Sequence, residues 1–200
     1  APTRSRIAQR WLGEVPVMVV GLIMMALCIT LLASRGVPIS LEGIWVNARL
    51  FALFVIVFAC LDTAREMATK RPQSLIAHLR ARYFGARARA IFAAGAPMLA
   101  VAVVLLPFFS MMKAAIPLFN EYSWDATFIR WDRAIFFGRD AWEVLQPMLG
   151  YPLVTALLAL LYQLWFLLLY PGVLFFAFCP VDPDVRRRFF LSYILSWTVI

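Results

Sequence analysis

The longest uncharged stretch of the chain is the feature that most constrains its fold. Residues 148–179 contain no Asp, Glu, Lys or Arg, and residues 15–33 form a second uncharged run. At about 1.5 Å of rise per residue, a helix over the longer stretch would measure about 48 Å, against roughly 30 Å for the hydrocarbon core of a bilayer. We therefore expect this helix to tilt, to begin near residues 151–152, or to break near residues 171–172.

Composition indicates the class of protein. Hydrophobic residues make up 64% of the 200 residues and charged residues only 15%. A soluble domain is about half apolar and about a quarter charged. Strands could cross a membrane only as a closed barrel, whose segments alternate in polarity instead of running apolar throughout. The sequence therefore predicts an all-α fold, a polytopic transmembrane helical bundle with short interfacial helices.

The order of apolar and charged segments predicts the domain organisation, a single membrane domain over residues 1–200. The last apolar run has 12 residues, too few to cross, so we expect the chain to end inside a fifth or later span of a longer protein. The predicted segments are a cytoplasmic lead-in at 1–14, two spans within 15–61, a basic cytoplasmic loop at 62–89, a span at 90–109 containing two prolines, outer-face interfacial helices at 110–147, a long span at 148–179, a short charged loop at 182–188 and a partial span at 189–200.

Basic residues are shared unevenly among these connections. The N-terminal segment, the 62–89 loop and the 182–188 loop together hold 13 of the 19 Lys and Arg residues. Because basic residues concentrate on the cytoplasmic side of membrane proteins, we expect these three segments in the cytoplasm and residues 120–147 on the outer face. The predicted location is a bacterial inner (plasma) membrane, with several passes and a cytoplasmic N-terminus.

The 62–89 loop has the pattern of a helix that lies on an anionic leaflet, with an apolar stripe beside arginines. We predict that Arg80, Arg82 and Arg87 contact anionic lipid head groups. Arg49 lies in the first turns of the second predicted span, where it either snorkels to the head groups or pairs with a buried or lipid anion. A nucleic-acid partner is not expected, because the basic patch is tied between two spans.

Residues 120–147 are the only long segment in which charges and aromatic rings are densely mixed. Trp124 and Trp131 are seven residues apart and share a helical face, while Asp125 and Asp132 share a neighbouring one. We predict two short helices at the membrane surface, with these indoles and that of Trp142 at the level of the lipid head groups. The simpler alternative is an aromatic anchor with no catalytic role.

Helix-punctuating residues predict the bounds of these two helices. Ser123 is the expected N-cap of the first helix, and Gly138 is expected to follow it in a left-handed turn. Asp140 and Glu143 have the spacing of a capping box that would open the second helix. Pro147 is expected to stop that helix.

Cysteine and histidine usage excludes several kinds of site. Cys28, Cys60 and Cys179 lie within or at the ends of apolar runs, and they lack the paired spacing of a metal site or a disulfide framework. His78 is the only histidine, so no centre with several imidazole ligands can be built from these residues. We predict no metal and no cofactor.

Residues from about 118 to 200 contain a run of motifs that resembles one family. The segment YSWDATFIRWDRAIFFGRDAWEVLQP is followed by LGYP, by LYQLWF and by RRRFFLSYILSW. It is similar to the type 2 phosphatidic acid phosphatase superfamily, in the branch related to inositol phosphorylceramide synthase. The pattern W-D-x-x-F…D…G-x-D-x-W-x-x-L-x-P is met by Trp124, Asp125, Phe128, Asp132, Gly138, Asp140, Trp142, Leu145 and Pro147.

This resemblance implies a membrane lipid phosphatase or head-group phosphotransferase that works through a phosphohistidine intermediate. It implies a nucleophilic histidine, a second histidine oriented by an aspartate, and basic side chains that bind the phosphate. His78 fits neither role, so the catalytic residues are expected beyond Ile200. The residues expected near the substrate head group are Asp125, Asp132, Arg133 and Asp140.

A second class of function is compatible with the same sequence. A helical scaffold rich in aromatic residues could be a non-catalytic accessory subunit of a larger membrane complex. The expected partners are membrane lipids in the first case and other membrane subunits in the second. A transporter or channel is less favoured, because no internal repeat is evident and few ionisable residues lie within the predicted spans.

Overall fold

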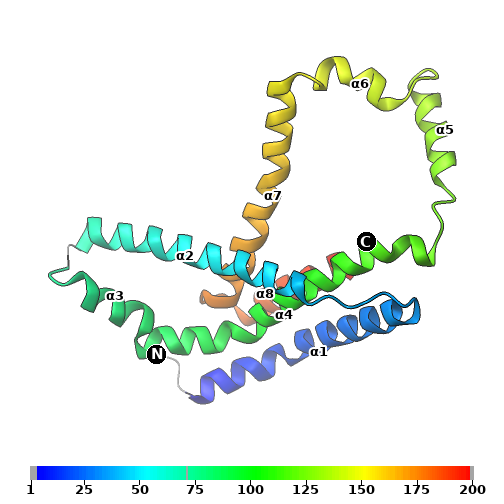
Figure 1. Ribbon diagram of the computed structural model, residues 1–200. Coiled ribbons are helices and arrows are strands. Elements are labelled where there is room, and N and C mark those ends of the chain that lie inside the picture. Colours follow the sequence, from blue (N-terminus) through cyan, green and yellow to red (C-terminus); the bar gives the residue numbers. More distant parts are fainter. Residues whose placement is uncertain (1–3, 71, 199–200) are drawn as a thin grey trace. The chain divides into compact units, whose positions relative to one another are not determined.

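The computed structural model describes residues 4–70 and 72–198, and all regular structure in this part of the chain is helical (Figure 1). The predicted all-α fold is confirmed for these residues. The helices are α1 (Arg4–Ser34), α2 (Glu42–Lys70), α3 (Leu75–Phe84), α4 (Ala86–Phe119), α5 (Asp125–Ile135), α6 (Ala141–Leu149), α7 (Pro152–Phe178) and α8 (Pro183–Thr198).

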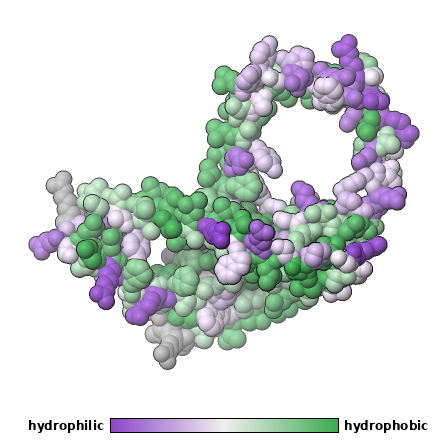
Figure 2. Space-filling model, viewed as in Figure 1, coloured by the Kyte–Doolittle hydropathy of each residue, from purple (hydrophilic) through white to green (hydrophobic). Residues whose placement is uncertain are grey.

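Four helical segments are long and apolar enough to cross a membrane: Ile7–Ser34, Glu42–Lys70, Leu75–Phe119 and Pro152–Phe178. Large apolar side chains project outward from them, and Figure 2 shows such side chains over α1 and α2. On α7, for example, Leu153 is 82% and Leu168 is 73% exposed. So much bare apolar surface is unfavourable in water and is stable when lipid chains cover it.

The predicted spans end at charged residues, but the helices of the structure continue through those residues. α2 continues past residue 61 to Lys70, and α4 already begins at Ala86, so most of the predicted 62–89 loop is helical. Its residues are mainly good helix formers, and Glu66 pairs with Lys70 four residues on at 2.9 Å. α4 also continues through Pro97 and Pro107, the two prolines of the predicted 90–109 span.

The last two helices begin at prolines. α7 begins at Pro152, one of the three alternatives predicted for the long apolar stretch, and continues past Pro171. α8 begins at Pro183, so the predicted loop at 182–188 is wrong. The Asp182 carboxylate accepts the backbone N–H groups of Asp184 and Val185 at 2.9 and 3.2 Å. An aspartate N-cap followed by proline is a favourable helix start, because proline lacks the N–H that would otherwise need a partner.

The chain divides into two compact units, Ala1–Lys113 with Tyr170–Ile200 and, separately, Ala114–Leu169. The first unit has a true core, in which α1 packs against α8 and Met98, Leu105 and Phe190 are fully or almost fully buried. Within residues 114–169, Ala115 alone is buried. The second unit therefore presents nearly all of its side chains to its surroundings.

The predicted bounds of α5 and α6 are only partly correct. Gly138 has φ +84°, so the left-handed turn after α5 is confirmed. Ser123 is not the N-cap, because Trp124 directly precedes α5 and makes no side-chain cap. Asp140 does precede α6, but its side chain caps no backbone N–H, so the predicted capping box does not form. α6 also continues through Pro147 to Leu149.

Candidate functional site

The first unit contains a polar cluster where α3 packs against the end of α2. Its centre is Glu66, which is only 7% exposed. One carboxylate oxygen of Glu66 lies 2.9 Å from Lys70 Nζ and 3.2 Å from His78 Nε2, and the other lies 3.4 Å from Arg82. These contacts hold α3 to α2, and we call the group the Glu66 cluster.

Asp62, one helical turn before Glu66, fixes the same arginine. Its two oxygens accept Arg82 N–H groups at 2.5 and 2.7 Å, and one of them also accepts the Tyr83 hydroxyl at 2.7 Å. The Tyr83 hydroxyl lies within 3.0 Å of the Ala59 carbonyl and 3.1 Å of Thr63. Two carboxylates therefore neutralise and orient Arg82.

A pocket of about 750 Å³ opens beside this cluster, between α2, α3 and α4. Its charged lining residues are Asp62, Arg82 and Arg87, and His78 and Tyr83 add polar atoms. Further along α2 and α4 the lining becomes apolar, with Val55 and Leu99, and Phe178 from the end of α7 completes it. In Figure 1, α3 runs from the end of α2 to the start of α4. The pocket thus combines a charged region with an apolar one.

A second polar group links α2, α4 and α7 inside the first unit. Asn47 is 4% exposed, and its amide donates to the backbone carbonyls of Ala102 and Val103 at 3.3 and 2.8 Å. Its oxygen accepts the Tyr170 hydroxyl at 2.9 Å. Because every contact is made to the protein itself, we interpret this group as structural.

A third polar group joins α1 to the ends of α7 and α8. Arg186 is 4% exposed and donates to Glu14 at 3.3 Å and to the carbonyls of Phe176 and Cys179 at 2.7 and 2.9 Å. Arg10 also donates to Glu14, at 3.2 Å. Burial lowers the pKa of Arg186, but the ordinary value is so high that the guanidinium stays charged. Arg186, counted from sequence as a cytoplasmic loop charge, is thus an internal cation that satisfies the carbonyls at the end of α7.

The predicted head-group residues lie in the second unit, on α5 and beside α6. Arg133 and Asp140 form an ion pair, with N–O distances of 2.7 and 3.3 Å. The Arg133 guanidinium holds the pKa of Asp140 below its ordinary value. Asp125 and Asp132 make no side-chain hydrogen bond or ion pair with any residue that the structure describes. The structure therefore brings together two of the four.

The predicted aromatic residues form an exposed row along α5. Phe128 lies between Trp124 and Trp131, with ring centroids 6.2 and 5.6 Å apart. Both indoles are more than half exposed, and so is Trp142 on α6. This row has the chemistry of an interfacial anchor, which was the simpler alternative.

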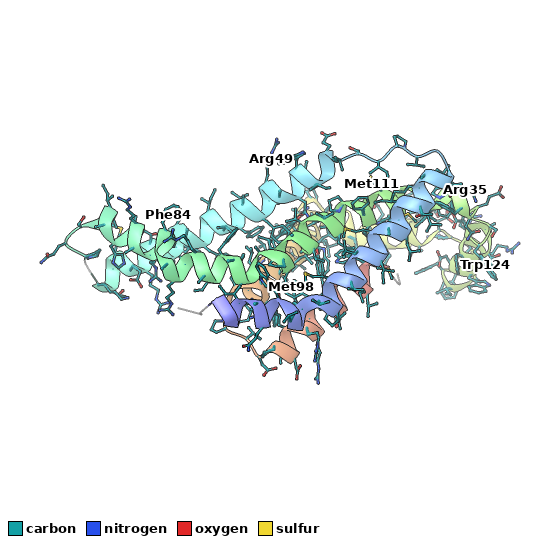
Figure 3. The ribbon with its side chains drawn as sticks, turned by 90° about the horizontal axis from the view of Figure 1, so that it is seen from below. Arg35, Arg49, Phe84, Met98, Met111 and Trp124 are labelled. Atoms are coloured by element: carbon teal, nitrogen blue, oxygen red, sulfur yellow. The ribbon has the colours of Figure 1, made fainter. Side chains whose placement is uncertain are left out.

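The four predicted lipid-binding arginines are not gathered in one place. Arg82 and Arg87 line the large pocket, whereas Arg80 lines a smaller groove with Ile76, Leu79 and Phe84. Arg49 is exposed, and in Figure 3 its side chain points away from α4. Its exposure fits snorkelling better than pairing with a buried protein anion.

Several polar residues that organise the first unit were not singled out from the sequence. Glu14 directly precedes an apolar run and Glu66 lies among basic residues, so each had the signal of an isolated carboxylate near cations. Asn47 stands out only as a polar residue within an apolar span. Tyr170, a polar residue of the long apolar stretch, is predicted to pack between helices, and its burial against α2 confirms this.

No family model, curated protein or solved structure matches this chain. Among the residues that the structure describes, no group of three or more His, Cys, Asp or Glu side chains could hold a metal ion. The residues that the structure describes form an all-α protein, and its four long apolar helices indicate a helical membrane protein.

Proposed function

We propose that this chain is the lipid-binding part of a membrane lipid phosphatase or head-group phosphotransferase that uses a phosphohistidine intermediate. The observation that carries the proposal is the α5–α6 segment, which carries both an exposed row of aromatic rings and the Arg133–Asp140 ion pair. The residue pattern of the same segment resembles the type 2 phosphatidic acid phosphatase superfamily. The proposed location is a bacterial inner membrane, with the N-terminus in the cytoplasm.

In this proposal each predicted residue of α5 and α6 has a role. The indoles of Trp124, Trp131 and Trp142 would anchor the segment at the level of the head groups. Asp140 engages Nε and one terminal nitrogen of Arg133, which leaves further N–H donors of the guanidinium for a phosphate oxygen. Asp125 and Asp132 would contact polar groups of the same substrate.

The test is phosphate release by the protein expressed from its complete gene, with phosphatidic acid as substrate in mixed micelles. We expect Arg133→Gln to lower kcat/KM roughly tenfold, because a charge-assisted contact to phosphate is lost. Arg130→Gln is the matched control, since Arg130 is exposed on the same helix and, among the described residues, its side chain forms no ion pair and donates one hydrogen bond, to Thr127. Absence of turnover with any lipid phosphate would contradict the proposal.

One observation favours the accessory-subunit alternative. His78 is hydrogen-bonded to Glu66 inside the Glu66 cluster, and phosphohistidine chemistry of the proposed kind needs two histidines. The proposal therefore requires histidines that these 200 residues do not supply. Co-purification from native membranes with another subunit in a fixed ratio, together with no turnover, would establish the accessory role.

A further inference from the structure

We infer that the pocket between α2, α3 and α4 binds the head group and upper acyl region of one anionic phospholipid. This inference does not depend on phosphoryl transfer, because it concerns a different unit from α5 and α6 and is tested by binding alone. It rests on the charge balance of the pocket, on its apolar lining and on the way α3 is held.

Of the two arginines that line the pocket in the described part of the chain, one is free to bind an anionic ligand. Arg82 is neutralised by Asp62 and Glu66, as described above. Arg87 also lines the pocket, and its side chain makes no hydrogen bond or ion pair with any residue that the structure describes. An unpaired guanidinium beside a recess has the donors and the charge to bind a phosphate oxygen.

The apolar lining identifies the rest of the ligand. Phe92 on α4 is 60% exposed and stacks on Phe178, with ring centroids 5.8 Å apart. Leu99, two turns further along α4, continues this surface away from Arg87. A free phosphate would leave these side chains bare, whereas the chains of a phospholipid would cover them. Charge and apolar surface together therefore favour a lipid over a soluble anion.

The charged end of the pocket is preformed. Asp62, Glu66, His78 and Tyr83 fix α3 against α2 through the contacts given above. Figure 2 shows hydrophilic side chains around α3 beside the apolar surface of α2. A phospholipid whose phosphate lies level with α3 would meet charged groups at its head and apolar groups along its chains. Binding would need little rearrangement of the protein.

The experiment is native mass spectrometry of the full chain in detergent, titrated with phosphatidylglycerol or with phosphatidylcholine. The wild-type chain should bind phosphatidylglycerol more tightly. Arg87→Gln should weaken phosphatidylglycerol binding about tenfold and phosphatidylcholine binding clearly less, because both lipids carry a phosphate but the choline cation of phosphatidylcholine offsets its charge. Arg87→Lys should retain most of the preference.

The matched control is Arg89→Gln, which removes the same charge from α4 at a residue that does not line the pocket. It should change phosphatidylglycerol binding less than twofold. Equal weakening by both variants would show diffuse electrostatic attraction and overturn the inference. Competition by glycerol phosphate at the same concentration as the lipid would also overturn the inference. The wild-type chain tests the site without any substitution, because equal binding of the two lipids would overturn the inference as well.

Discussion

At the scale of single residues, buried charge is the most consequential feature of the first unit. Glu14 and Arg186 are 5% and 4% exposed. Removing Glu14 would leave Arg186 without its carboxylate partner, and removing Arg186 would leave Glu14 with Arg10 alone and deprive two backbone carbonyls of their guanidinium donor. Removing one member of a buried ion pair costs several kcal/mol, because the remaining charge stays desolvated. By contrast, the exposed pair between Arg187 and Asp184, at 2.6 Å, contributes at most about 1 kcal/mol.

We therefore expect Arg186→Met to lower the free energy of unfolding by about 3 kcal/mol, and Arg187→Met by less than about 1 kcal/mol. The measurement is thermal unfolding of both variants in the same detergent. A double variant with Glu14→Gln should lose less than the sum of the two single losses, because the charges are coupled. Equal losses for Arg186→Met and Arg187→Met would show that the buried pair does not form.

At the scale of helices, the presence of four long apolar helices was predictable from sequence, because a helix needs about 20 apolar residues to cross a bilayer. The helix ends were not, since Asp62–Lys70 and residues 183–188 are charged yet helical. Contact of Arg82 and Arg87 with lipid head groups stays a prediction from the basic amphipathic pattern. The sequence did not predict that Arg82 is paired with two carboxylates whereas Arg87 is paired with none among the described residues, because the pairing of Arg82 depends on α3 packing against α2.

Helix packing inside the first unit depends on a glycine of α4. A Cβ atom on Gly95 would lie 2.5 Å from both the Ala177 carbonyl oxygen and the Phe178 ring, so α4 and the end of α7 approach closely there. Gly95→Ala should lower the free energy of unfolding by about 1–3 kcal/mol, because the helices must separate. Thermal unfolding in detergent measures the loss.

Gly13 is the matched control, because it is also helical and a Cβ there would meet nothing within 4 Å. Gly13→Ala should raise stability by about 0.5–1 kcal/mol, since alanine has the higher helix propensity. If both alanine variants were stabilising, the close contact of α4 with α7 would be refuted.

At the scale of the whole molecule, sidedness depends on how the arginines are counted. The structure buries Arg186, so the segment at 182–188 carries less weight than its three arginines indicate. The α2–α3–α4 connection keeps its basic character, because only Arg82 and Lys70 among its cations are paired with carboxylates in the described residues. This connection, more than the C-terminal one, supports a cytoplasmic face.

Sidedness can be tested across the span Leu75–Phe119. In a chain whose three cysteines are replaced by alanine, we would place a single cysteine at Gln73 or at Glu121, both exposed and one on each side of this span. A membrane-impermeant maleimide should label Glu121→Cys in intact spheroplasts and Gln73→Cys only after permeabilisation. Labelling in denaturing detergent confirms that each thiol is reactive. Because a helix of this length and hydropathy crosses the bilayer once, labelling of both sites from one side would refute the span. Labelling of Gln73→Cys alone in spheroplasts would instead keep the span, reverse the orientation, and place the indoles of α5 in the cytoplasm.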